Sequence, residues 1–339
     1  MFTDSTVFKN DIKYISGLIG EGLKGKTVAV TGVCGMIGTV LAYALLDADC
    51  TIIGIDISEE RAHDRFDKYI KDGRFRFFAQ DITKPFEIKA HCDYIIHAAS
   101  NAYPKAFELD PVGTMLQNFM GIKYLLDYAT KHNARVLYIS TGEVYGQSDG
   151  SDFNESYSGY VDITNPRSCY PSSKRASETL CASYVKQYGT NAVIVRPSHV
   201  YGLTATAADT RASTQFIRAG VEGRDIVMKS KGEQVRSYTY VADCAAAMLY
   251  VLQYGNKGEA YNISNKNSVV SIREMADIIA DICNVKVRFE IPDEAEKASY
   301  NPVTRSVLSC DKLAELGFEG RYDMRMGLEL TIKALKENV

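Results

Sequence analysis

A phenol and an ammonium group stand four residues apart in this chain, at Tyr170 and Lys174. On a helix, residues at this spacing lie one above the other on the same face. A tyrosine with the ordinary pKa of about 10 is a poor base at neutral pH, but a nearby lysine cation favours the phenolate. Lowering that pKa to about 7 takes roughly 4 kcal/mol, which two close cations in a water-poor cleft can supply. The pair therefore predicts an acid/base catalyst, although the same spacing is common on helix surfaces.

A glycine turn near the N-terminus is the second feature that suits a chemical role. The run 26–38, KTVAVTGVCGMIG, has the pattern of a buried strand, a tight turn and the start of a helix. Such a turn aims backbone N–H groups and a helix N-terminus at a pyrophosphate. A structural turn that binds nothing is the alternative, but the flanking strand and helix favour a dinucleotide. The predicted cofactor residues in the turn are Gly32, Gly35, Met36, Ile37 and Gly38.

An acidic residue, Asp56, ends the next apolar run at 51–56. It follows the glycines by roughly twenty residues, where a carboxylate can accept hydrogen bonds from the adenosine ribose. The same carboxylate would repel a 2′-phosphate. The sequence therefore predicts NAD rather than NADP.

Alternating strands and helices must position these residues. Strands alternating with helices over this length require a parallel sheet with right-handed crossovers, so we predict a doubly wound α/β fold. After the strand of the glycine segment, apolar runs predict strands at 51–56, 75–79, 94–99, 136–140 and 192–196, and long helices at about 114–131 and 170–188. Before residue 26, a short amphipathic helix packed on this domain is predicted from Ile12, Ile15, Leu18, Ile19 and Leu23.

Composition limits the class of protein and its partners. A chain of 339 residues that is 46% hydrophobic can fill one large domain and a smaller one. A formal net charge of −3 gives no broad cationic surface, which argues against nucleic acid or an anionic membrane as the main partner. The eight cysteines form no C-x-x-C pair, no apolar run reaches the ~18 residues of a membrane span, and the N-terminus lacks a signal-peptide pattern. We therefore expect a cytoplasmic protein, and no metal site, because His97 has no second ligand at usable spacing.

The order of these motifs resembles that of a known family. Ser140 and Thr141 end the fifth strand, between the glycine turn and the Tyr170–Lys174 pair. From about residue 26 to 336 the chain resembles the extended short-chain dehydrogenase/reductase superfamily (the NAD-dependent epimerase/dehydratase family), whose members act largely on nucleotide sugars. The resemblance implies that Thr141 hydrogen-bonds the reacting hydroxyl and that Tyr170 takes its proton. Lys174 would also bind the nicotinamide ribose, and hydride would pass to C4 of NAD⁺.

Further cofactor contacts and the domain division are expected with this resemblance. The superfamily places an Asp-Ile pair against the adenine ring, and Asp81 and Ile82 match it, while the small residues Ala98 and Ala99 let the backbone approach the cofactor. We predict a Rossmann NAD-binding domain at 1–196, including the extra N-terminal helix, and a smaller mixed substrate-binding domain at 197–339 with some segments returning to the first. The substrate is expected between them. In the second domain we predict helices near 213–221, 241–254, 272–283 and 322–336 and a strand at 260–263.

Finer similarities narrow the reaction. The segment 140–146, STGEVYG, is similar to one in UDP-glucuronate decarboxylases and in sugar-nucleotide 4,6-dehydratases, while the segments 165–170, 174–181 and 232–238 are more similar to the decarboxylases. Dehydratases use adjacent Asp and Glu, but here the first of these is Gly142, which has no proton to give. A decarboxylase needs no such donor, because oxidation at C4 makes a β-keto acid that loses carbon dioxide. Glu143 and Arg236 would then handle protonation at C5, and Arg236 matches an arginine near the sugar carboxylate and diphosphate.

Two segments depart from the decarboxylase pattern. The chain has Asn101-Ala102-Tyr103 in place of a proline-rich turn, and His199 in place of an asparagine. The sugar or the reaction can therefore differ from that of the decarboxylases. The alternative functions are a nucleotide-sugar 4-epimerase, then a 4,6-dehydratase, or a non-catalytic NAD-binding scaffold. The predicted substrate residues are Asn101, Thr141, His199, Arg211 and Arg236.

Three of the charged residues also have structural explanations. Glu143 could be a surface carboxylate beside a turn, Arg211 a solvated loop arginine, and Arg236 an exposed charge on a strand. By analogy with relatives, the two long helices near 114–131 and 170–188 are expected to form a homodimer interface.

Overall fold

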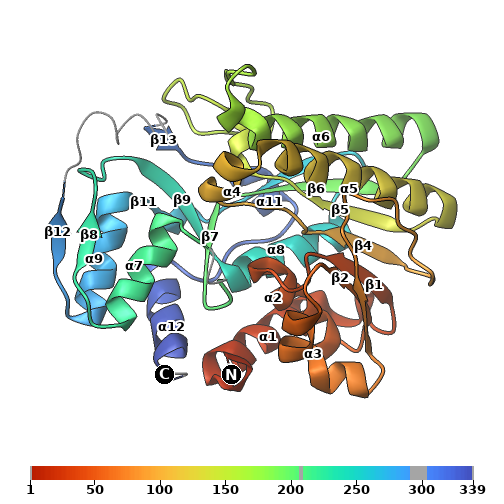
Figure 1. The fold of residues 1–339 in the computed structure, drawn as a ribbon, viewed down its shortest axis with the longest axis horizontal. Coiled ribbons are helices and arrows are strands. Elements are labelled where there is room, and N and C mark those ends of the chain that lie inside the picture. The colour runs from red at the N-terminus through yellow and green to blue at the C-terminus, as the bar shows by residue number, and fades with distance from the viewer. Residues whose placement is uncertain (1, 206–208, 291–303, 338–339) are drawn as a thin grey trace.

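The structure is a computed structural model that describes residues 2–205, 209–290 and 304–337. Within these residues the central element is a sheet of seven strands, made of β1 (Thr27–Thr31), β2 (Thr51–Asp56), β3 (Phe75–Ala79), β4 (Tyr94–His97), β5 (Arg135–Ile139), β6 (Ala192–Pro197) and β10 (Ala260–Ile263). The strands lie in the order β10-β6-β5-β4-β1-β2-β3, and every neighbouring pair is parallel (Figure 1). The predicted doubly wound α/β fold is confirmed.

Helices cover both faces of this sheet, as the alternation along β1 requires. Val28 and Val30 point into one core and Ala29 into the other, because successive side chains of a strand face opposite sides. The first core is closed by α1 (Thr6–Ile19), α2 (Met36–Asp47), α3 (Glu59–Lys71) and α8 (Val241–Tyr254). The second is closed by α5 (Pro111–His132) and α6 (Cys169–Tyr188), which run side by side along the top of Figure 1.

A smaller region continues from the end of β6. It contains a sheet of β7 (His199–Tyr201), β9 (Val235–Tyr240), β11 (Val269–Ser271) and β13 (Arg305–Ser306), and a pair of β8 (Ile226–Met228) with β12 (Val287–Phe289). Its helices are α7 (Ala212–Val221), α9 (Ile272–Cys283), α11 (Asp311–Glu315) and α12 (Met324–Lys336). The strand at 260–263 and the helix at 241–254 return to the main sheet, where the strand is β10 and the helix packs as α8; some segments of 197–339 were expected to return in this way.

Capping residues move two helix starts from their predicted positions. α5 begins three residues earlier than expected, because the Asp110 carboxylate accepts the N–H of Gly113 (2.8 Å) and Pro111 suits the first helical position. α12 begins two residues later, because Asp323 caps it in the same way. The strands predicted at 94–99 and 136–140 end at 97 and 139.

The N-terminal helix α1 is an integral part of the first core. Its apolar side chains Val7, Phe8, Ile12, Ile15 and Ile19 are buried, which confirms the predicted amphipathic helix, although Leu18 is exposed. Asp11 is buried on the same face and accepts hydrogen bonds from the hydroxyls of Tyr240 (2.5 Å) and Tyr322 (3.4 Å). The two chain ends also meet, because the Ser5 hydroxyl donates to Glu337 (2.7 Å) (Figure 1).

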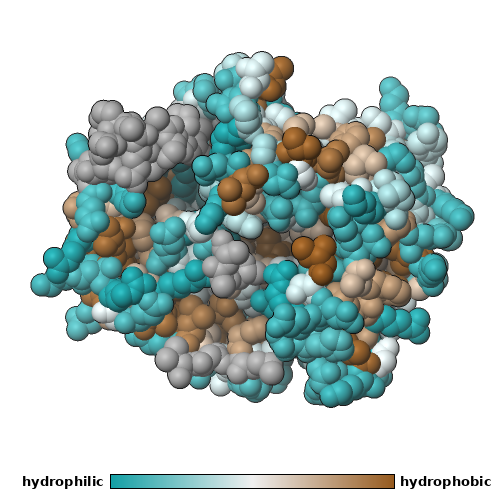
Figure 2. Space-filling view, viewed as in Figure 1, coloured by the Kyte–Doolittle hydropathy of each residue, from teal (hydrophilic) through white to brown (hydrophobic). Residues whose placement is uncertain are grey.

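The surface is mainly hydrophilic, with apolar side chains gathered over α4 (Pro104–Leu109) and α5 in the face drawn in Figure 2. None of the helices in the described ranges combines the length and apolar character needed to cross a membrane. All eight cysteines lie in the described ranges; they are free, and six are buried.

Candidate active site

The glycine turn between β1 and α2 leaves no room for side chains. Gly32 has φ +65°, and a Cβ placed there would lie 2.6 Å from the Cα of Ala99 at the end of β4. A Cβ on Gly38 would lie 2.2 Å from the carbonyl oxygen of Gly32. Gly35 precedes the first turn of α2 as its N-cap. The turn is thus held close to the sheet, and the N-terminus of α2, from Gly35 to Ile37, lines the cleft, where a helix N-terminus suits a pyrophosphate.

Asp56 ends β2 beside this turn and supports it. Its carboxylate accepts the N–H groups of Cys34 (3.0 Å) and Ile57 (2.8 Å). The guanidinium of Arg61, whose side chain is 43% exposed, lies 3.7 Å away. Both residues line the cleft, so the acid is placed where the sequence predicted a ribose partner, with a cation beside it that the sequence analysis missed.

Tyr170 lies in the first turn of α6 and is buried. Its ring stacks on Phe107 of α4, with ring centroids 4.6 Å apart. Burial raises its pKa above the ordinary value, and the Glu143 carboxylate adds to this, whereas a hydrogen bond with Thr141 lowers it. Without a further cation the phenol therefore stays protonated at neutral pH.

Lys174, one turn further along α6, is also buried. Its ammonium donates to the carbonyl oxygen of Ile139 (2.7 Å) and lies over the rings of Tyr138 and Tyr170, 4.9 Å and 5.9 Å from their centroids. Burial lowers its pKa to about 7, and the negative charge of Glu178 opposes that shift. Lys174 and Tyr170 contact each other as predicted, but the pKa of Lys174 is close to neutral pH.

Glu143 and Arg167 form an ion pair at the mouth of the cleft, with 3.3 Å between Arg167 Nη1 and Glu143 Oε2. Glu143 belongs to the short turn that Thr141 caps, because the Thr141 hydroxyl accepts its N–H (3.2 Å). Arg167 also lies over the outer face of Phe107, 4.8 Å from the ring centroid. The sequence analysis did not single out either Arg167 or Phe107, since both act through contacts between distant segments.

Arg236, on β9, is 5% exposed and lines the cleft. The alternative of an exposed strand charge is therefore wrong. Burial lowers the pKa of its guanidinium, while Tyr238 and Glu143 raise it. A buried cation in a cleft suits the binding of an anionic group of a ligand.

His199 and Arg211 lie near Arg236, and the charges of both arginines act on the His199 ring. The His199 ring lines the cleft and its Nδ1 is buried without a hydrogen-bond partner. Burial lowers its pKa to about 3, and the neighbouring arginines add to this, so the imidazole is neutral. Arg211 is tied to Asp209 (2.6 Å) and to the carbonyl oxygen of Val200 (3.0 Å), which corrects the alternative of a merely solvated loop arginine.

These groups surround one large cleft with a volume of about 2010 Å³. Pockets for a single small ligand are roughly 300–1,000 Å³, so the cleft has room for a dinucleotide and a second ligand. Of the predicted residues, Asp81 lies outside it: its exposed carboxylate accepts the N–H and hydroxyl of Thr83 (2.9 and 2.7 Å). The other predicted site residues line the cleft, namely Gly32, Gly35, Met36, Ile37, Gly38, Asp56, Ile82, Ala98, Ala99, Asn101, Thr141, Glu143, Tyr170, Lys174, His199, Arg211 and Arg236.

His97 is a packed residue and not a ligand. Its Nδ1 bonds the Thr31 hydroxyl (2.7 Å), and burial lowers its pKa to about 3. Across the described parts of the chain, no group of three or more His, Cys, Asp or Glu side chains could hold a metal ion.

Comparison with known proteins shows the family to which the chain belongs. The family model for the NAD dependent epimerase/dehydratase family matches residues 28–264. The chain belongs to this family. The resemblance predicted from the motifs is thereby confirmed, and NAD is the cofactor of the family. The residues present fit NAD, because the glycine turn, the N-terminus of α2 and Asp56 line the same cleft, which has room for a dinucleotide.

Relatives within the family carry several activities. UDP-glucuronic acid decarboxylase 6 of Arabidopsis thaliana is 30% identical over 304 residues, which cover 89% of this chain and 87% of the relative. UDP-glucuronic acid decarboxylase 1 of Danio rerio is 28% identical and is covered over 72% of its length, with 91% of this chain covered. The fold is shared with a UDP-glucuronic acid 4-epimerase from Bacillus cereus, which was solved with UDP-glucuronic acid and NAD. The TM-score is 0.78 at 22% identity, and the match covers 92% of this chain and 100% of that one. The fold likeness alone does not select the reaction.

Proposed function

We propose that the protein is an NAD-dependent nucleotide-sugar enzyme that oxidises C4, acts on the 4-keto sugar and returns the hydride. The preferred reaction is the decarboxylation of a UDP-hexuronate such as UDP-glucuronate. The observation that carries this proposal is the buried guanidinium of Arg236 in the same cleft as Thr141, Tyr170 and Lys174. The similarity to UDP-glucuronic acid decarboxylases over most of the chain supports it.

The residues have complementary roles in this reaction. NAD, when bound, supplies the hydride acceptor and a cationic ring beside the phenol. Thr141 holds the C4 hydroxyl and Tyr170 takes its proton, with Lys174 favouring the phenolate. The keto group makes the sugar a β-keto acid, whose carboxylate leaves as carbon dioxide in a water-poor site. Arg236 holds the anionic substrate, and Glu143 and Arg236 handle the proton delivered to C5.

The surroundings of Gly142 support decarboxylation over 4,6-dehydration. A dehydratase needs a proton donor at this position, and a Cβ there would already lie 3.1 Å and 3.3 Å from the two Cδ atoms of Leu308. A longer acidic side chain would have to displace Leu308. Position 142 thus supplies no acid for a departing C6 hydroxyl.

Incubation with UDP-glucuronate and mass spectrometry of the products tests the proposal. Decarboxylation releases carbon dioxide and yields a UDP-pentose. The second candidate, a 4-epimerase, yields a hexuronate isomer of unchanged mass. This candidate is supported by His199, whose neutral imidazole stands where the decarboxylase pattern has an asparagine. Loss of water would indicate a dehydratase, and an inert mixture with every nucleotide sugar would support a non-catalytic NAD-binding scaffold.

We also propose a homodimer. The resemblance placed its interface on the two long helices, α5 and α6, and the exposed apolar side chains add α4 to the face of α5. The apolar side chains of α4 and α5 that face solvent have exposed fractions from 37% to 73%. Leu109 ends α4, and Val112, Met115, Leu116 and Phe119 lie on one side of α5 at helical spacing. Figure 2 shows apolar side chains gathered over these two helices. A face of this kind suits burial against a second copy. We further propose a cytoplasmic location, which the eight free cysteines support.

The dimer is tested at Leu116, which is 48% exposed. Leu116→Glu places a charge in the proposed interface, and light scattering is expected to give the mass of a monomer where the wild type gives that of a dimer. The matched control is Tyr254→Glu on α8, which is 52% exposed and outside the face. A monomeric wild type contradicts the proposal.

A further inference from the structure

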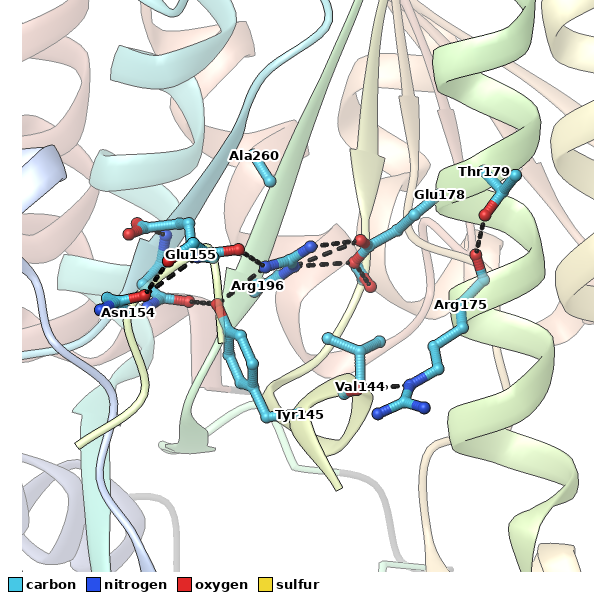
Figure 3. Close-up of polar contacts among 12 residues, drawn as sticks. Val144, Tyr145, Asn154, Glu155, Arg175, Glu178, Thr179, Arg196 and Ala260 are labelled. Atoms are coloured by element: carbon cyan, nitrogen blue, oxygen red, sulfur yellow. Dashed lines mark hydrogen bonds and ion pairs between the residues drawn. The ribbon is translucent and has the colours of Figure 1, made fainter. Parts of the chain in front are cut away.

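A buried ion pair lies directly behind the catalytic helix. Arg196, on β6, donates to both carboxylate oxygens of Glu178, on α6, with Nε–Oε1 3.0 Å and Nη2–Oε2 2.6 Å (Figure 3). The two side chains are only 14% and 11% exposed. A forked pair of this kind is strong and directional, but removing one partner leaves a buried charge without compensation.

The carboxylate of this pair contacts the chain on both sides of the catalytic residues. Glu178 accepts the hydroxyl of Ser140 (2.5 Å), the residue before Thr141 at the end of β5. It also lies one helical turn beyond Lys174 and acts on it electrostatically. One side chain therefore connects the threonine segment, the lysine and the neighbouring strand.

The guanidinium of the pair contacts the segment that follows β5. Arg196 Nη1 donates to the Tyr145 hydroxyl (2.9 Å) and to the carbonyl oxygen of Glu155 (2.9 Å) (Figure 3). Tyr145 in turn donates to Asn262 of β10 (2.6 Å), whose N–H bonds the Glu155 carboxylate (2.7 Å). The network joins α6, β6 and β10 to the segment after β5.

We propose that Glu178 and Arg196 are positioning residues, which lock the catalytic helix against the ends of β5 and β6 and set the charge that keeps Lys174 a cation. The role of Lys174 in this statement rests on the proposed function. Neither residue of the pair lines the cleft, so their effect is exerted through Lys174 and Thr141.

The charge balance around Lys174 gives the direction of the effect. Burial alone lowers the pKa of Lys174, and the Glu178 carboxylate raises it. The other titratable groups that interact with the ammonium are Cys181 and Tyr170 on α6, Tyr138 on β5 and His97 on β4, of which His97 is neutral. Removing the charge of Glu178 must lower the pKa of Lys174. Removing the charge of Arg196 leaves the carboxylate less neutralised and must raise it.

The reduction potential of bound NAD reports this charge without any sugar turnover. Reduction converts the cationic nicotinamide ring into a neutral one, so a neighbouring ammonium favours the reduced form and its deprotonation lowers the potential. The potential of the holoenzyme is measured against pH by equilibration with a dye couple. A Tyr170→Phe background removes the other titrating group, so that the break in the profile belongs to Lys174.

Glu178→Gln is expected to move this break to lower pH by about one pH unit, and Arg196→Gln to move it to higher pH. Glu178→Asp, which retains the charge, should restore part of the shift. The control is Glu222→Gln, in an exposed pair with Arg224, which should leave the break unmoved. A purely structural role predicts weaker folding in both variants with no opposite displacement, and that result overturns the proposal.

A double variant keeps the test valid where a single one does not fold. Glu178→Leu with Arg196→Met removes both charges and leaves no buried ion, a change that proteins often tolerate. Its break is expected at lower pH, but by less than for Glu178→Gln, because the loss of the Arg196 charge acts in the opposite direction. An unchanged break in the folded double variant overturns the proposal, whereas loss of the sugar reaction alone does not bear on it.

Discussion

At the scale of single residues, the site is organised around the charge on one phenol. Tyr170 is buried and stacked on Phe107, and burial raises its pKa, which favours the neutral hydroxyl. Lys174 is close enough to act on it, but its own pKa is lowered to about 7. The cationic nicotinamide ring is therefore needed as the second charge that favours the phenolate.

Tyr170→Phe removes the group that takes the proton. We expect kcat to fall by roughly 10²–10⁴-fold, the usual contribution of a positioned acid or base, with NAD still bound. Steady-state turnover and the absorbance of copurified cofactor measure the two effects. The control is Tyr188→Phe, at a tyrosine that is 55% exposed. Unchanged turnover in Tyr170→Phe would support the scaffold function instead.

Asp56→Asn tests the choice of cofactor. The substitution keeps an acceptor for the Cys34 N–H but removes the negative charge, and it leaves the exposed cation of Arg61 free to pair with a 2′-phosphate. We expect NAD affinity to fall by about 10–100-fold, which corresponds to the loss of hydrogen bonds to a charged group, and NADP affinity to rise. Fluorescence titration with NADH and NADPH measures both. Asp64→Asn on the exposed side of α3 is the control, and an unaltered preference would refute the role of Asp56.

Most of the site residues could be predicted from sequence because their positions follow from the sheet. Gly32, Asp56 and Thr141 stand at strand ends, where the ligands of parallel α/β folds bind. Arg167 and Phe107 could not be predicted, since they meet only when α4 packs beside the turn before α6. Asp81 was placed against the adenine by motif alone. Its Oδ1 accepts hydrogen bonds from Thr83 of its own loop, and its contact with the adenine stays a prediction.

At the scale of elements, the turn between β1 and α2 has the least tolerance. Gly38→Ala would force a Cβ to within 2.2 Å of the Gly32 carbonyl oxygen, so the helix must move away from the strand. We expect a destabilisation of about 1–3 kcal/mol, typical of overpacking, and weaker NAD binding. Urea unfolding and cofactor titration measure these effects. Gly17→Ala on α1, where a Cβ meets nothing within 4 Å, is the matched control, and equal behaviour of the two variants would contradict the argument.

Long elements were predictable and short ones were not. The main strands and helices have clear apolar periods, so their centres were placed correctly. Strands of two or three residues, such as β8 and β13, are too short to have a period. The membership of β10 in the main sheet is decided by its pairing with β6. The paired residues, such as Ala260 and Ile194, are 66 positions apart, so the pairing leaves no local pattern.

At the scale of the whole molecule, one buried carboxylate joins the two ends of the chain. Asp11 of α1 bonds Tyr240 of β9 and Tyr322, and burial raises its pKa to about 6. The folded state therefore binds this proton more tightly than the unfolded state. Its contribution to stability is present at pH below about 4 and is lost as pH rises through about 6.

Asp11→Asn removes this titration. Relative to the wild type, the variant should gain stability on the order of 3 kcal/mol between about pH 4 and pH 7, because only the wild type must ionise a buried group. Urea unfolding at the two pH values gives the difference. Asp64→Asn, at an exposed site, should follow the wild type. If the free energies of unfolding of Asp11→Asn and the wild type change with pH in the same way, the Asp11 carboxylate does not ionise between about pH 4 and pH 7.

The position of β10 has a consequence for synthesis of the chain on the ribosome. β6 remains an open sheet edge until residues 260–263 have emerged, and α1, made first, lacks its partners α8 and α12 until the last residues follow. Exposed strand edges and apolar helix faces are the surfaces on which nascent chains associate wrongly. A ribosome stalled after about residue 200 would therefore carry an aggregation-prone intermediate that depends on chaperones, and not a folded NAD-binding domain.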